Sequence, residues 1–207
     1  MPDNKSEGSP EQKGGKEQIV EHIHVDRRTQ PGHPNRAPEP VAGKDSLRWL
    51  YISAAVILLD QATKIFVINV LELYQRVNVL PVFDFVRLHN TGAAFSLFAD
   101  AGGWQRWFFT ILALVVSGVI VWWQWNLPRT KHTVLSLGLA LVLAGALGNV
   151  IDRIMYGYVV DFLLFYIGDW SWPAFNVADI AITCGVTLIL VDNIVLESRR
   201  GGRRATD

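Results

Sequence analysis

Two aspartates in the last third of the chain stand among strongly apolar residues. Asp161 lies between two valines and a Phe-Leu-Leu run, and Asp179 opens a long apolar segment shortly after Asn176. A carboxylate in such surroundings loses hydration, so its pKa should rise unless partners hold its charge. Two such carboxylates close together share one proton. One can then act as a base towards water while the other donates a hydrogen bond to a carbonyl group, which is peptide hydrolysis without a metal or a covalent intermediate.

Each of these aspartates also allows a purely structural interpretation. Asp161 could lie exposed on the polar edge of a strand at a membrane surface, and Asp179 could cap the N-terminus of the helix that follows it. Asn176, Asp179 and Thr183 are spaced at i, i+3 and i+7, which gives one polar stripe on an otherwise apolar helix.

A second polar group closes another apolar run. Asn149 and Asp152 fall on one helical face, and Arg153 follows them. The guanidinium of Arg153 offers a fork of donors that could hold a carboxylate or a lipid phosphate. An ordinary helix end with an arginine at the interface would have the same sequence, so the alternative stays open.

Asp60 and Lys64 form a third polar group, this time inside the first apolar run. Their i, i+4 spacing places them on one helical face, where they can pair. Ionisable groups within membrane helices are costly and usually functional. Either the two form a structural ion pair with Lys64 extending towards the interface, or they brace an active site from behind.

The elements that must position these groups are four apolar segments, each about as long as the 20 residues that a spanning helix needs. They cover residues 49–68, 107–125, 133–150 and 175–196, and tryptophans gather at several of their edges, as at membrane interfaces. The predicted fold is therefore an α-helical polytopic membrane protein with four transmembrane helices. Two long connections join the spans on one side, over residues 69–106 and 152–174. Alternation over residues 82–90 predicts a strand there, and residues 158–165 are too few to span, so we expect them to lie along or dip into the interface.

The chain divides into three expected parts. Residues 1–46 are rich in Pro, Gly and charged groups and predict a disordered cytoplasmic tail, residues 47–197 form the membrane domain, and residues 198–207 form a basic cytoplasmic tail. Both termini are expected inside, because short flanks on the cytoplasmic side carry an excess of Lys and Arg. The basic residues counted on that side are Lys44, Arg48, Arg129, Lys131, Arg199, Arg200, Arg203 and Arg204, against Arg76, Arg87, Arg106 and Arg153 on the other.

Other chemistries have little support in the sequence. The chain has no His-Glu-x-x-His pattern, no Gly-x-Ser-x-Gly pattern and no phosphate-binding glycine loop, and its five histidines lie outside the predicted spans. The single cysteine, Cys184, excludes an internal disulfide and is expected to be a small buried packing residue rather than a nucleophile. No metal, no cofactor and no nucleic acid is expected.

Five stretches, taken together, resemble the lipoprotein signal peptidase family, also called prolipoprotein signal peptidase or signal peptidase II. They occur in the family's order and span residues 47–196. The stretches are Asp60-Gln61-Ala62-Thr63-Lys64, His89-Asn90-Thr91-Gly92-Ala93-Ala94-Phe95-Ser96, Gly148-Asn149-Val150-Ile151-Asp152-Arg153, Val159-Val160-Asp161-Phe162 and Phe175-Asn176-Val177-Ala178-Asp179.

The resemblance implies an intramembrane aspartyl endopeptidase with Asp161 and Asp179 as its catalytic pair. It implies a substrate, a prolipoprotein whose cysteine already carries diacylglycerol, and cleavage just before that cysteine. It also implies a small outer sheet and an interfacial helix in the two long connections, inhibition by globomycin, and a monomer in the bacterial cell membrane with its active site near the outer face. The supporting positions that it implies are Asp60, Lys64, Asn90, Asn149, Asp152, Arg153, Asn176 and Ala178.

Two features depart from the family pattern, and two other classes of function compete with it. The polar N-terminal stretch is longer than the family's usual start, and Ile180 stands where serine is more often expected after the second aspartate. A proton-coupled transporter would spread polar residues through the full depth of the spans, whereas here they gather in the outer half. A non-enzymatic membrane scaffold would need no carboxylate pair.

Overall fold

The computed structural model describes residues 46, 48–92, 103–127 and 132–196. Both predicted tails fall outside this range except for Ser46. Between the spanning helices, the described residues 71–92 and 156–176 form strands, turns and irregular segments, and residues 93–102 lie outside the description, so the expected interfacial helix is not tested there.

Four helices carry the fold. They are α1 (Trp49–Val70), α2 (Trp104–Asn126), α3 (Thr133–Met155) and α4 (Val177–Val191), and a short π-helical segment, η3 (Asp192–Leu196), continues α4. Within the described residues, four helices are long and apolar enough to cross a membrane, as predicted. Helix α3 continues five residues beyond the expected end at residue 150, and this extra turn carries Asp152 and Arg153.

Helix α3 is the centre of the bundle, because it packs against α1, α2 and α4 and buries most of its surface. Leu135, Leu139 and Leu143 on α3 form an apolar core with Ile120 of α2 and with Leu127. The other three helices leave many large apolar side chains exposed, as expected for surfaces that face lipid.

The approach of α4 to α3 is unusually close at Gly145. A Cβ atom added to Gly145 would lie 2.2 Å from the carbonyl oxygen of Ala178, which leaves no room for any larger residue. The first turn of α4 is therefore held directly against the α3 backbone, at the level of Asp179.

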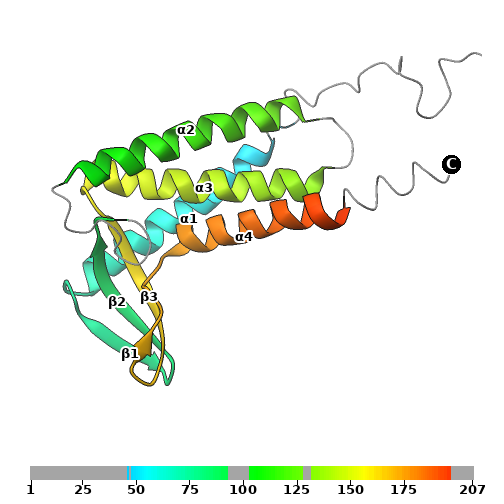
Figure 1. Ribbon diagram of the computed structural model, residues 1–207. Helices are drawn as coiled ribbons and strands as arrows, with labels where there is room; N and C mark the ends of the chain where they lie inside the picture. Colours follow the sequence, from blue (N-terminus) through cyan, green and yellow to red (C-terminus); the bar gives the residue numbers. More distant parts are fainter. Residues whose placement is uncertain (1–45, 47, 93–102, 128–131, 197–207) are drawn as a thin grey trace, which may run out of the picture. The chain divides into compact units, whose positions relative to one another are not determined.

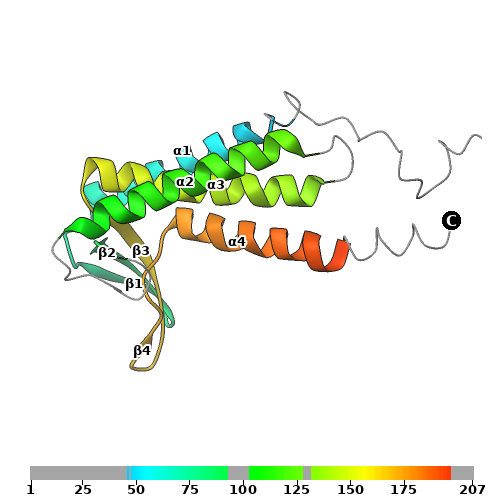
Figure 2. The same cartoon turned by 45° about the horizontal axis from the view of Figure 1, so that its top comes forward.

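A four-stranded antiparallel sheet lies at one end of the bundle, where α1 and α3 end and where α2 and α4 begin (Figures 1 and 2). Its strands, in sheet order, are β1 (Arg76–Leu80), β2 (Phe83–Asn90), β3 (Val159–Ile167) and β4 (Trp170–Ser171). Strand β2 confirms the strand predicted over residues 82–90. The segment expected along the interface is β3, which pairs with β2 so that Leu88 faces Asp161 and Asn90 faces Val159.

The expectation for Cys184 was wrong. The side chain is exposed on α4 rather than buried. The reason is that an apolar run in a spanning helix turns part of its surface towards lipid, so apolar neighbours do not indicate burial within the protein.

Candidate active site

Asp161 lies on β3 beside the N-terminus of α4, and its carboxylate is held by two amides. Oδ1 accepts a hydrogen bond from Asn176 Nδ2 at 2.7 Å, and Oδ2 accepts one from Asn90 Nδ2 at 2.9 Å. The position of Asn90 is fixed in turn, because its Oδ1 accepts from the backbone N–H of Gly92 at 3.0 Å. Asp161 is 3% exposed, so the surface-exposed interpretation of this residue is wrong.

Burial, as the main cause, and the neighbouring charge of Asp179 together raise the pKa of Asp161 from 3.8 to about 7. The hydrogen bonds from Asn90 and Asn176 oppose this rise without cancelling it. A carboxyl group with a pKa of about 7 carries its proton in about half of the molecules at neutral pH, whereas an ordinary aspartate is almost fully ionised there.

Asp179 lies in the first turn of α4 and forms a capping box with Asn176. The Asn176 side chain accepts from the Asp179 backbone N–H at 3.0 Å, and Asp179 Oδ2 accepts from the Asn176 backbone N–H at 3.2 Å. The capping interpretation of Asp179 is therefore confirmed. Its other oxygen, Oδ1, accepts from Asn149 Nδ2 at 2.9 Å. One carboxylate oxygen thus serves the helix cap while the other faces α3.

Asn176 joins the two aspartates. Its Nδ2 donates to the Asp161 carboxylate, its Oδ1 caps the backbone of Asp179, and its backbone N–H donates to the Asp179 carboxylate, so one fully buried residue contacts both carboxylates. An asparagine suits this position because it carries a donor and an acceptor on one planar group. Thr183, the third member of the predicted stripe, does not join them, because its hydroxyl donates to the backbone carbonyl of Asp179.

Lys64 is the centre of a buried ion cluster behind the aspartates. Its ammonium lies 2.9 Å from Asp60 Oδ2, 2.9 Å from Asp152 Oδ2 and 3.0 Å from Asn149 Oδ1. The side chain is 1% exposed, so the expectation that Lys64 extends towards the interface is wrong. Three acceptors match the three protons of the ammonium.

The two acidic members of this cluster each hold one of the aspartate-bearing segments by its backbone. Asp60 Oδ1 accepts from the N–H of Ala178 at 2.9 Å, one residue before Asp179. Asp152 Oδ2 accepts from the N–H of Val160 at 3.1 Å, one residue before Asp161. The cluster therefore fixes the backbone of β3 and the backbone of the first turn of α4 relative to each other. The buried methyl group of Ala178 has no direct part in this, since the contact uses its backbone.

Arg153 lies on the same side of α3. Its guanidinium donates to the backbone carbonyl of Asn149 at 3.3 Å and to that of Gly92 at 3.4 Å, and it lies 5.4 Å from the ring centre of Phe109. It binds neither aspartate directly. Among the residues that the structure describes, no group of three or more His, Cys, Asp or Glu side chains is arranged to hold a metal ion.

Comparisons with known proteins identify the family of the chain. The family model described as signal peptidase II matches residues 52–195. The chain belongs to the signal peptidase II family. It is 53% identical over 146 residues to a lipoprotein signal peptidase of Alteromonas mediterranea, covering 70% of this chain and 80% of that protein. It is 46% identical over 162 residues to one of Cupriavidus taiwanensis, covering 78% and 91%, and 50% identical over 155 residues to one of Acinetobacter baumannii, covering 75% and 88%.

A solved structure supports the same assignment at the level of the fold. A bacterial membrane enzyme determined by the in meso method at 2.3 Å resolution superimposes with a TM-score of 0.63 at 27% identity, covering 76% of this chain and 92% of that one. The stretch matched by the signal peptidase II model contains both aspartates and every supporting residue predicted from the sequence. Membership of a protease family favours the peptidase over the transporter and scaffold alternatives.

Gln61 belongs to this candidate site, although the sequence analysis did not name it among the supporting residues. Its Nε2 donates to Asp152 Oδ1 at 2.9 Å, to Asp60 Oδ2 at 3.1 Å and to the Gly148 carbonyl at 3.2 Å. It thus ties α1 to α3 beside the Lys64 ammonium. The signal in the sequence was a polar amide next to Asp60 within a predicted membrane span, although helical spacing alone does not place positions 60 and 61 on one face.

Proposed function

We propose that this chain is an intramembrane aspartyl endopeptidase that removes the signal peptide from diacylglyceryl-modified prolipoproteins, cutting just before the lipidated cysteine. The observation that carries the proposal is the bridge made by Asn176, which donates to the Asp161 carboxylate from its side chain and to the Asp179 carboxylate from its backbone N–H. Two carboxyl groups fixed in this way, one protonated and one ionised, are what water-activating peptide hydrolysis needs.

The roles of the two aspartates follow from their surroundings. Asp161 carries the shared proton, because it is 3% exposed and its pKa is about 7. Asp179 carries the negative charge, which the N–H of Asn176, the amide of Asn149 and the N-terminal end of α4 all stabilise. Asp179 is also the less buried of the two, so water can approach it.

The reaction proceeds in two steps. Asp179 takes a proton from a water molecule as the water oxygen attacks the scissile carbonyl carbon, and Asp161 gives its proton to the carbonyl oxygen. A neutral tetrahedral intermediate results. In the second step Asp179 passes its proton to the leaving amide nitrogen, Asp161 recovers its proton from the hydroxyl group, the C=O bond re-forms and the C–N bond breaks. Both carboxyl groups return to their starting states, so no cofactor is consumed.

The site sits at the end of the bundle that carries the sheet, and we assign this end to the outer membrane face. The asymmetry of Lys and Arg between the two sides supports cytoplasmic termini. A substrate whose signal helix and acyl chains both dissolve in lipid would then present its cleavage site to Asp161 and Asp179 at the outer interface. A globomycin-type cyclic peptide that competes for this position is the expected inhibitor, and the protein acts as a monomer.

The test is a gel-shift cleavage assay on a purified diacylglyceryl-modified prolipoprotein. Wild type is compared with Asp161→Asn, with Asp179→Asn and with a matched control, Glu72→Gln, which removes an exposed carboxylate from the loop after α1. Each catalytic substitution is expected to lower kcat by about a thousandfold or more, because general acid–base groups of this kind contribute about 10² to 10⁴ each. The control should cut like wild type.

Two further measurements test the cleaved bond and the requirement for a lipidated substrate. Mass spectrometry of the product locates the cut bond, and a bond other than the one before the cysteine refutes the stated specificity. An unlipidated prolipoprotein should not be cut, and equal cleavage of both forms refutes the lipid requirement. If either asparagine variant retains full activity while its circular dichroism matches wild type, the aspartyl mechanism is refuted.

A further inference from the structure

The hairpin formed by β3 and β4 has two chemically different faces. Ile167 pairs with Trp170, and the Trp172 N–H donates to the Phe165 carbonyl, so these four side chains share one face. Tyr166 pairs with Ser171 on the opposite face. The first face is entirely apolar and aromatic apart from the indole N–H groups.

The opposite face of the hairpin is polar and charged. The Tyr166 hydroxyl accepts from Asn78 Nδ2 at 2.8 Å, and the same amide donates to Asp84 Oδ1 at 2.8 Å. Arg76 binds Asp84 and lies over the Tyr166 ring at 4.6 Å. Burial of Asp84 is opposed by the hydrogen bonds from Arg76 and Asn78, and together these leave its pKa below the usual range, so this face is charged at neutral pH.

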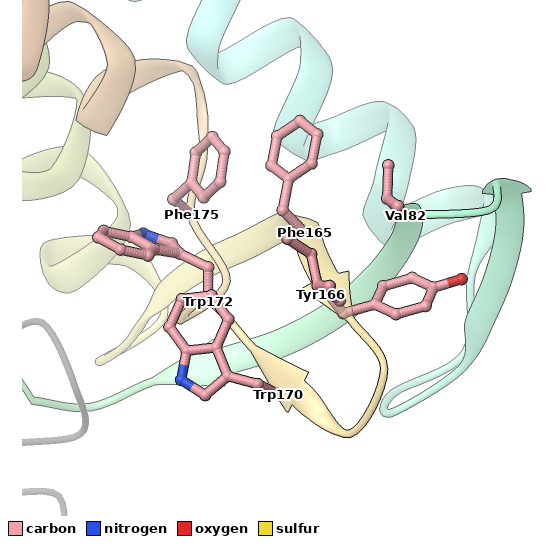
Figure 3. Close-up of a pocket in the computed structure, with 7 residues that line it drawn as sticks. Val82, Phe165, Tyr166, Trp170, Trp172 and Phe175 are labelled. Atoms are coloured by element: carbon pink, nitrogen blue, oxygen red, sulfur yellow. The ribbon is translucent and has the colours of Figure 1, made fainter.

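The apolar face is hollowed into a pocket of about 390 Å³. Figure 3 shows Phe165 and Phe175 turned to the same side of the sheet, with the tryptophans beside them. The residues that line it are Val82, Phe165, Tyr166, Ile167, Trp170, Trp172 and Phe175. Ile167 is 73% exposed and Trp170 is 59% exposed, which is a large apolar surface to leave in water.

This face continues directly into the surface of the spanning helices. The ring of Phe165 stacks on that of Phe175 at 5.9 Å, and Phe175 immediately precedes Asn176, the residue that caps α4. On the outer turns of α1, Phe66 is 65% exposed and Val70 is 57% exposed. These helix surfaces face lipid, since α1 and α4 are membrane spans.

We propose that the apolar face of the β3–β4 hairpin rests in the outer leaflet and that its pocket takes an acyl chain of a bilayer phospholipid. The proposal goes beyond the peptidase reaction and does not depend on it. Tryptophans concentrate at membrane interfaces because an indole combines an apolar ring with one polar N–H. Asp169, the one charged side chain between Phe162 and Phe175, lies exposed in the turn, which suits a position at headgroup depth rather than in the hydrocarbon.

The chemistry of the pocket selects a lipid chain over a polypeptide. The Tyr166 hydroxyl is already bonded to Asn78, and the Phe165 carbonyl is already bonded to the Trp172 N–H. A peptide segment seated there would bury backbone N–H and C=O groups without partners, at a cost of roughly 1 to 3 kcal/mol for each group. A hydrocarbon chain has no such groups to satisfy.

The test measures depth directly, on the full chain in phospholipid nanodiscs. Cys184 is first replaced by serine, and a nitroxide spin label is then attached to Ile167→Cys on the apolar face or, as a matched control, to Ser171→Cys on the other face of the same hairpin. Collisions with oxygen, which partitions into lipid, are compared with collisions with a water-soluble nickel chelate. Wild type labelled at its own exposed Cys184 supplies the reference for a site within the bilayer.

The expected result is oxygen access at position 167 close to that of the Cys184 reference, with the nickel chelate dominating at position 171. Chelate access at both positions overturns the proposal. So does protection from both agents at position 167, which would mean that protein covers the pocket. A label at 167 that becomes oxygen-accessible only after a diacylglyceryl peptide is added would assign the pocket to substrate instead. Phe165→Cys repeats the measurement if the first substitution does not fold, and circular dichroism checks every variant.

Discussion

The ammonium of Lys64 lies 3.0 Å from Oδ1 of Asn149, and this contact decides which way the Asn149 amide faces. An ammonium can only donate, so the amide oxygen turns towards it and the amide nitrogen turns towards Asp179, to which it donates at 2.9 Å. A residue on α1 thereby orients the donor that reaches a carboxylate on α4. Lys64 contacts neither Asp161 nor Asp179, so we assign it a positioning role.

Replacing Lys64 by methionine should destabilise the fold strongly. The change keeps the length of the side chain but leaves Asp60 and Asp152 buried without their common cation, and breaking a buried pair in this way costs about 3 to 5 kcal/mol. The measurement is thermal unfolding in detergent, and the control is Arg48→Met, which removes an exposed cation from the start of the same helix. A Tm loss no larger than that of the control would contradict the role given to the cluster.

The spans and this ion pair could be predicted from sequence because both depend on local spacing. About 20 apolar residues define a spanning helix, and i, i+4 spacing places Asp60 next to Lys64. The burial of Lys64 could not be predicted in the same way. It depends on Asp152, which lies on α3 with Asn149 as expected, but whose contact with Lys64 on α1 leaves no signal in the sequence. The exposure of Cys184 likewise depends on which side of α4 faces the other helices.

The sheet was predicted only in part, for a related reason. Strand β2 has a long alternating pattern, whereas β1 is exposed along its whole length and β4 has two residues, so neither carries a periodic signal. Asp161 and Asp179 were singled out by chemistry, since each is an acid in an apolar run. Their connection through Asn176 follows only from the tertiary contact between β3 and the start of α4.

The rate of cleavage should fall as pH rises through about 7. In the proposed mechanism Asp161 holds the shared proton, its pKa is about 7, and only the protonated form can donate to the substrate carbonyl. Above that pH the active fraction decreases by about tenfold for each unit. The measurement is kcat/KM between about pH 5 and about pH 9 at constant ionic strength, with Tm recorded at each pH as a control. A profile that stays flat across the alkaline range would show that Asp161 is not the proton donor.

Asp161→Asn should make the inactive protein more stable than wild type at alkaline pH. The folded-state pKa of about 7 is higher than the ordinary 3.8, so the stability that protonation of Asp161 contributes is complete below pH 3.8 and is lost as pH rises through about 7. The asparagine variant has no such loss. The variant loses about 1 kcal/mol of folding stability because one amide contact is mismatched. Its net gain in folding stability over wild type at high pH is therefore on the order of 1 to 3 kcal/mol.

The measurement is the free energy of unfolding of Asp161→Asn and of wild type, from denaturation curves at about pH 8 and about pH 4. The variant should be the more stable protein at about pH 8, and its advantage should shrink or reverse at about pH 4. Asp192→Asn is not a suitable control, because Asp192 is itself buried. Glu72→Gln is suitable, since Glu72 is exposed. Equal stability differences at the two pH values would refute the link between Asp161 burial and pH.

Asn176 should be needed for stability and for activity through different atoms. Asn176→Ala removes the helix cap and the donor to Asp161 together, which should cost about 2 to 3 kcal/mol. Asn176→Asp keeps the cap acceptor but brings a third carboxylate against Asp161, so it should fold better than the alanine variant and still fail to cut substrate. Asn193→Ala, an exposed asparagine further along the chain, is the matched control for unfolding. Full activity of Asn176→Asp would contradict the bridging role.

Adding a methyl group to α3 at position 145 should displace the first turn of α4 and with it Asp179. Gly145→Ala would place a Cβ atom 2.2 Å from the Ala178 carbonyl and 2.6 Å from Ile182 Cγ1, so the first turn of α4 must move away and carry Asp179 out of reach of Asn149. Overpacking of this kind costs about 1 to 3 kcal/mol. Gly118→Ala is the matched control, because nothing lies within 4 Å of its added Cβ atom and alanine favours a helix over glycine by about 0.5 to 1 kcal/mol. The two substitutions should therefore shift Tm in opposite directions, and only Gly145→Ala should lower kcat. A Gly145→Ala protein with wild-type kcat would show that the position of Asp179 does not depend on the close contact between α3 and α4.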